Sequence, residues 1–172
     1  MNEQNKILLA IIVTAIVVGS GAYYFLGNKA SETISSKQEN AIFSQSSKEY
    51  AIMGRQTWSA FECSALASHI DKATEAERLF MYGYEQGKKF LEALRAEKID
   101  EKDISQEVPI GLTLLLGGPS EDFMLGRIYS SAEEETLNEV FKTGNDFNSD
   151  EIQKMIAENK FRDRNCQLIG KN

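Results

Sequence analysis

Glu121 and Asp122 are the side chains whose place in the sequence most favours chemistry. They follow two glycines and a proline in the stretch GGPSED, which predicts a sharp corner. A carboxylate pair can act in general acid–base catalysis, and an arginine such as Arg127 or Arg78 can hold an anionic ligand. The same residues also suit a helix start and ion pairs, with Glu85 or Asp122 as partners of the arginines. We therefore treat these four residues as candidate partner or ligand contacts, not as catalytic residues.

The other residue types leave little room for catalysis or metal binding. His69 is the only histidine, and it falls on an apolar helical face, where a packed side chain is expected. A zinc site would need His69 together with both cysteines and a carboxylate. The chain lacks a G-x-S-x-G motif, a Walker-type phosphate loop and the calcium-loop spacing of an EF-hand. The sequence predicts a protein that is not an enzyme and has no catalytic residue, metal or cofactor.

Cys63 and Cys166 are the only two cysteines, and neither lies in a metal-ligand spacing. A lone pair that flanks most of a domain is typical of a disulfide formed in an oxidising compartment. The alternative is two separate buried thiols, because free cysteine packs well as a small apolar residue. We favour the disulfide, since an export signal precedes the domain.

That signal is the apolar N-terminal stretch. From Ile7 to Asn28 there are 22 residues without a charged side chain, and about 20 such residues in a helix cross a membrane. Residues 1–28 are therefore predicted to form a signal-anchor that spans the membrane from Ile7 to Gly27. The alternative is a signal peptide cleaved near Ala22. Tyr23 and Tyr24 favour the anchor, because they extend the apolar run and suit a membrane interface.

Charge and composition divide the rest of the chain. Residues 29–50 are rich in serine and charge and predict a linker or stalk. Residues 51–172 contain 15 basic and 22 acidic residues, so they carry the whole net charge of −7. An acidic domain is repelled by a phosphate backbone, so a nucleic acid is not an expected partner.

The domain over residues 51–172 is predicted to be all-α. The helical pattern begins at about Ile52, with Thr57 as the cap of a first helix whose apolar face runs from Trp58 to Ile70. A T-x-x-E capping box at Thr74 opens a second helix. On that helix Gly83 and Gly87 lie four residues apart on one face, which indicates close contact with another element.

The stretch VPIGLTLLLGGPSED predicts two helices that meet at a tight corner. Its uncharged run from Val108 to Gly118 has only 11 residues, too few for a second membrane span. We expect a short, deeply buried helix after Pro109 that ends at the glycine pair, although a buried strand is the alternative. Pro119 or Ser120 then starts the next helix.

Two more helices complete the prediction. The acidic run from Glu133 to Glu135 is interpreted as the exposed first turn of a helix that ends at Gly144. Asn148 or Ser149 caps the last helix, and Cys166 follows it.

These features together favour a membrane-tethered helical module that binds a protein partner at the cell envelope. Inhibitors, immunity proteins, exclusion factors and accessory subunits share this layout, which is an analogy and not a sequence match. The expected location is the inner membrane, with the C-terminal domain in the periplasm. The alternatives are a structural subunit of a membrane complex, with Gly19 and Ala22 at a helix contact, and a small carboxylate-dependent hydrolase.

Overall fold

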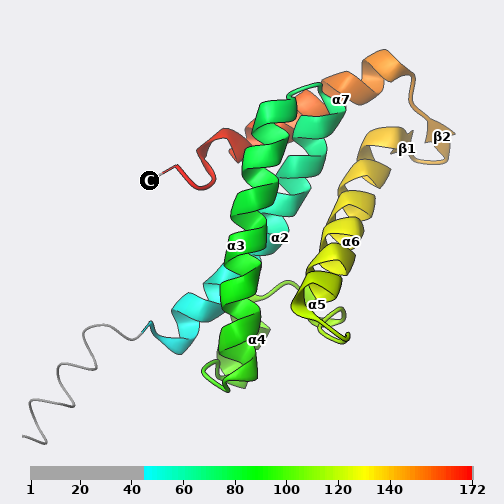
Figure 1. Cartoon of the computed structure of the whole chain (residues 1–172). Coiled ribbons are helices and arrows are strands. Elements are labelled where there is room, and N and C mark those ends of the chain that lie inside the picture. The colour runs from blue at the N-terminus through cyan, green and yellow to red at the C-terminus, as the bar shows by residue number, and fades with distance from the viewer. Residues whose placement is uncertain (1–44, 172) are drawn as a thin grey trace, which may run out of the picture. The chain divides into compact units, whose positions relative to one another are not determined.

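The computed structural model describes residues 45–171, which lie in one compact unit of the chain (Figure 1). The predicted anchor and the predicted linker up to Ser44 fall outside the described residues. Within residues 45–171 no helix is long and apolar enough to cross a membrane. The described residues are mostly helical, as predicted. The elements are α2 (Ser47–His69), α3 (Ala73–Arg95), α4 (Glu101–Glu107), α5 (Ile110–Thr113), α6 (Glu121–Phe141), β1 (Lys142–Thr143), β2 (Asp146–Phe147), α7 (Asp150–Asp163) and the 3-10 helix η1 (Cys166–Leu168).

Helix α2 begins at Ser47, ten residues before the predicted cap. Ser46 and Glu49 form a reciprocal capping box, in which each side chain binds the backbone N–H of the other. The last residues of the predicted linker are therefore helical. Thr57 is instead buried in the middle of α2, and its hydroxyl donates to the carbonyl of Met53 at 2.8 Å.

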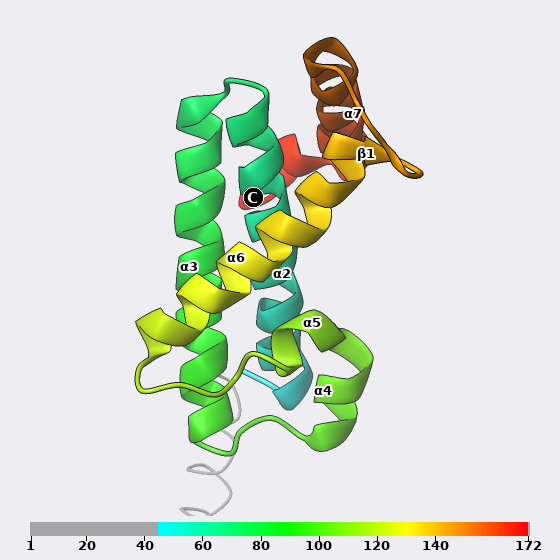
Figure 2. The ribbon, with the colours of Figure 1, turned by 90° about the vertical axis from the view of Figure 1, so that its right-hand side faces the viewer.

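Helix α3 runs antiparallel to α2 and packs along its length (Figures 1 and 2). A Cβ built at Gly83 would lie 2.9 Å from the ring of Phe61 on α2. The predicted close contact at the glycine pair is therefore confirmed. The predicted capping box at Thr74 does not form: Lys72 is the N-cap residue, and its side chain makes no capping hydrogen bond.

Helix α6 crosses the α2–α3 pair obliquely (Figure 2). Ser120 caps it as predicted, since its side chain accepts from the N–H of Phe123. The helix is continuous from Glu121 to Phe141, so the predicted new start at Glu133 is wrong. Ser130 and Ser131 lie within the helix because the packing of Ile128 and Ala132 on the core outweighs their weak helix propensity.

The chain then makes a two-residue antiparallel hairpin, β1–β2, with Gly144 at a φ of 65°. Helix α7 follows, with Ser149 as its N-cap residue as predicted. All four strand residues are exposed, which explains why no alternation of buried apolar and exposed polar residues predicted the hairpin.

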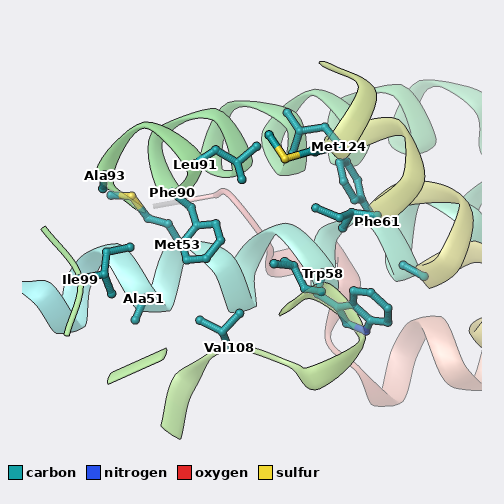
Figure 3. Packing of buried hydrophobic residues seen from close by; sticks show 14 residues of the cluster. Ala51, Met53, Trp58, Phe61, Phe90, Leu91, Ala93, Ile99, Val108 and Met124 are labelled. Atoms are coloured by element: carbon teal, nitrogen blue, oxygen red, sulfur yellow. The ribbon is translucent and has the colours of Figure 1, made fainter. Parts of the chain in front are cut away.

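Two apolar clusters form the core. The larger one lies between α2, α3, the α4–α5 segment and α6, and includes Trp58, Phe61, Phe90 and Leu112 (Figure 3). The second lies where α2, α3, α6 and α7 meet η1, and it contains both cysteines. Cys63 and Cys166 lie at disulfide distance, with 5.5 Å between their Cα atoms, which is the spacing that the predicted pairing requires.

Candidate binding surface

The short helix α5 exposes apolar side chains. Ile110 is 78% exposed and Leu114, directly after the helix, is 76% exposed. Leu112, between them, is fully buried. The prediction of a deeply buried helix is therefore wrong, because a single helical turn has only one inner side and Leu112 occupies it.

The inner side of α5 is fixed by an aromatic ring. A Cβ built at Gly111 would lie 2.7 Å from the Trp58 indole, so only glycine lets the backbone rest at this distance. Trp58 itself is 6% exposed and belongs to the larger core cluster (Figure 3). The exposed side chains of α5 are therefore mounted on a rigid base.

A groove separates α5 from α4. It has a volume of about 390 Å³ and is lined by Glu101, Ile104, Ser105, Val108, Ile110 and Thr113. Most of this lining is apolar, and Ile110 forms part of its wall. We call the groove together with Ile110 and Leu114 the α5 face.

The α5 face borders an acidic stretch. Residues 99–122 contain six acidic side chains and one lysine. Glu107 forms ion pairs with Lys48, at 3.3 Å, and with Arg55. Asp103 accepts a hydrogen bond from the hydroxyl of Ser47. Asp100 and Glu101 are exposed and have no ion-pair partner among residues 45–171.

The predicted carboxylate pair lies at the start of α6 and joins it to α3. Glu121 accepts from Arg95 at 2.8 Å, and Asp122 accepts from the Tyr84 hydroxyl at 2.6 Å. That hydrogen bond raises the pKa of Tyr84, because ionising the phenol would remove the donor facing a carboxylate. Both carboxylates are thus engaged in contacts that orient α6.

Arg127 holds the loop before α6. Its guanidinium donates to the carbonyl of Gly117 at 2.8 Å and lies 5.7 Å from the centre of the Phe123 ring. Of the four predicted contact residues, Glu121, Asp122 and Arg127 therefore gather at one corner, which follows the α5 face in the chain.

Arg78 lies elsewhere. It is 17 residues from Arg95 on the same helix, which corresponds to about 26 Å along the axis. Arg78 binds Glu75 through two nitrogens, at 2.9 and 2.7 Å, and donates to the carbonyl of Ile169. The pairing with Glu85 or Asp122 is not observed. The hydrogen bonds from Arg78 lower the pKa of Glu75, and the arginine holds the C-terminal segment against α3.

The other candidates for chemistry have structural surroundings. His69 is half-buried and meets the Phe141 ring edge-on at 5.4 Å between ring centres. Glu62 forms an ion pair with Arg164 at 2.8 Å, and burial raises its pKa against the opposing effect of that arginine. Over residues 45–171 no three His, Cys, Asp or Glu side chains are grouped as metal ligands.

A second exposed apolar group lies on the β1–β2 hairpin and the start of α7. Phe147 is 75% exposed, Met155 55% and Ile152 43%. The Lys142 ammonium lies 4.6 Å from the centre of the Phe147 ring. This group is also exposed and apolar, which makes it a natural comparison for the α5 face.

Comparisons with known proteins identify no relative. No protein-family model, no curated protein and no solved structure matches the chain.

The sequence did not predict that apolar residues of the α5 face would be exposed at the surface. The available signal was their number: Ile110, Leu112, Leu114, Leu115 and Leu116 fall within seven positions. One turn of helix cannot turn all of them toward a core.

Proposed function

We propose that the chain is a membrane-tethered, non-enzymatic helical module that binds a protein partner at the cell envelope through the α5 face. The observation that carries this proposal is the exposure of Ile110 on α5 and of Leu114 directly after it, on a backbone that packs against Trp58. Large apolar side chains that cluster on the exposed surface of a protein commonly mark an interaction site.

The energetics favour binding at this surface. Burying one large aliphatic side chain contributes about 1.5–3 kcal/mol, so Ile110 and Leu114 are suited to act as anchors. The backbone that carries these side chains is already held against Trp58 before the partner binds, so the loss of conformational entropy on binding is small.

The tether is supported by the sequence. The uncharged segment from Ile7 to Gly27 is long enough to span a bilayer, and the Cys63–Cys166 pair suits an oxidising compartment. The domain of this proposal faces the periplasm from the inner membrane.

The two alternatives have less support. A hydrolase at Glu121 and Asp122 would need carboxylates available to a substrate, whereas these two bind Arg95 and Tyr84. A purely structural subunit that acts through Gly19 and Ala22 of the anchor leaves the α5 face unexplained.

Photo-crosslinking on the full chain in its native cells tests the proposal. We expect the Leu114→p-benzoylphenylalanine variant to give a discrete adduct with one other protein. The matched control is Met155→p-benzoylphenylalanine, also exposed and apolar but at the hairpin end, which should give no such adduct. No protein adduct at Leu114, or equal adducts at both positions, would contradict the proposal.

A further inference from the structure

The groove of the α5 face is open and apolar along one wall and acidic at one end. It is lined by Ile104 on α4 and Val108 directly after that helix, and by Ile110 and Thr113 on α5. Glu101, at the first turn of α4, lines the same groove. An occupant must therefore offer apolar side chains and tolerate a carboxylate beside them.

Among residues 45–171 no cation lies within ion-pair distance of Asp100 or Glu101, and Lys98 and Lys102 flank them in the sequence. Glu107 and Glu121, in contrast, each form an ion pair. Asp100 occupies the N-cap position of α4, yet its side chain makes no capping hydrogen bond. The helix dipole stabilises both acids to a small extent, but it leaves their outward oxygens free.

The negative charge of Asp100 and Glu101 favours some occupants of the groove over others. A second copy of the chain would bring an identical acidic rim against Asp100 and Glu101, and like charges oppose such a contact. An anionic lipid surface is disfavoured for the same reason. A segment with lysine or arginine beside its apolar residues complements both the apolar groove and the acidic residues at its end.

On the basis of the proposed function, we infer that the partner presents a basic amphipathic segment to the α5 face. Its apolar side chains fill the groove between α4 and α5, and its lysines or arginines pair with Asp100 and Glu101. The apolar contacts supply most of the affinity, while the exposed ion pairs contribute orientation and rate of association.

The test uses the full chain in native membranes, with Ile110→p-benzoylphenylalanine as the probe in the groove wall. Reversing two charges with Asp100→Lys and Glu101→Lys should lower the yield of the protein adduct about tenfold, because two attractions become repulsions. The matched control is Glu151→Lys with Glu158→Lys on α7, two exposed acids distant from the groove, which should leave the yield unchanged.

Two further readouts identify the occupant. The yield should fall as salt is raised, because exposed ion pairs are screened. Sequencing the crosslinked peptide should show apolar residues flanked by lysine or arginine.

The outcomes separate this inference from the proposed function. A protein adduct that charge reversal does not change, or a crosslinked peptide without basic residues, overturns the inference and leaves the proposed function standing. An adduct with a second copy of the chain, or with lipid, also overturns it. Absence of any protein adduct at both Ile110 and Leu114 overturns both.

Discussion

Gly83 sets the distance between α2 and α3. Its missing side chain leaves room for the Phe61 ring, which Phe80 and Tyr129 hold in place at centroid distances of 5.6 and 5.4 Å. Because that ring is fully buried and cannot move aside, Gly83→Ala should destabilise the domain by about 2 kcal/mol through overpacking. Denaturant unfolding of the variant measures this.

Gly126 provides the matched control for that substitution. It lies within α6, is exposed, and a Cβ there meets nothing within 4 Å. Gly126→Ala should therefore stabilise the protein by up to about 1 kcal/mol, the usual gain of alanine over glycine in a helix. Equal effects of the two substitutions would show that the α2–α3 contact is not as close as described.

The contributions of Glu62 and Glu75 to the stability of the fold should change with pH in opposite directions. Burial raises the pKa of Glu62, so the folded state disfavours its ionised form and loses stability as pH rises through the glutamate range. Glu62→Gln should therefore gain stability relative to the wild type as pH increases from about 3 to 7.

The hydrogen bonds from Arg78 lower the pKa of Glu75, which has the reverse consequence. The ionised form stabilises the fold above the ordinary glutamate pKa, and this contribution is lost as pH falls. Glu75→Gln should be less stable than the wild type at neutral pH, with the difference closing in acid. Thermal melting of both variants across the pH range provides the measurement, and parallel profiles would contradict the account.

At the scale of elements, the C-terminal segment is held at two points. Cys166 joins η1 to α2 across a sequence separation of 103 residues, and Arg78 binds the Ile169 carbonyl. Replacing both cysteines, Cys63→Ala with Cys166→Ala, should lower the free energy of unfolding by about 2–5 kcal/mol.

Hydrogen exchange locates the effect of that double variant. The amides of residues 166–170 should lose protection first, while those of α2 and α3 around Phe61 keep theirs, because the larger apolar cluster contains neither cysteine. Unchanged stability and protection would mean that the second cluster alone holds the segment.

The helices that sequence predicted well are those with local signals. Ser120 and Ser149 sit at helix starts as expected, and the glycine pair of α3 indicated its close contact. The start of α2 was predictable from the S-x-x-E pattern at Ser46 but was missed, because few apolar residues precede Ile52.

Other features depend on contacts between distant residues. The continuity of α6 past Ser130 is set by packing on the core, which no local pattern reveals. Glu121 and Asp122 were correctly placed at a corner, but their partners Arg95 and Tyr84 are 26 and 38 residues away. The exposure of Ile110 and Leu114 likewise follows from a distant contact, because the backbone at Gly111 packs directly against the Trp58 ring.

At the scale of the whole molecule, the proposed tether has a direct consequence for the mature chain. If residues 1–28 remain as a membrane anchor, the protein isolated from its native cells retains these residues and resists extraction from membranes by carbonate. Deleting residues 1–28 should prevent its recovery with the membrane. A mature chain that begins at Tyr23 would instead identify a cleaved signal peptide.

The central claim is that the α5 face binds a protein partner. Co-purification of the tagged full chain from native envelopes, with the retained proteins quantified by mass spectrometry, tests it most directly. The variants are Ile110→Glu with Leu114→Glu, and as a control Ile152→Glu with Met155→Glu at the hairpin end. We predict one protein retained in stoichiometric amount by the wild type and the control, and reduced at least about tenfold by the α5 variant. Retention that is equal in all three, or absent in all three while each stays folded, would contradict the account.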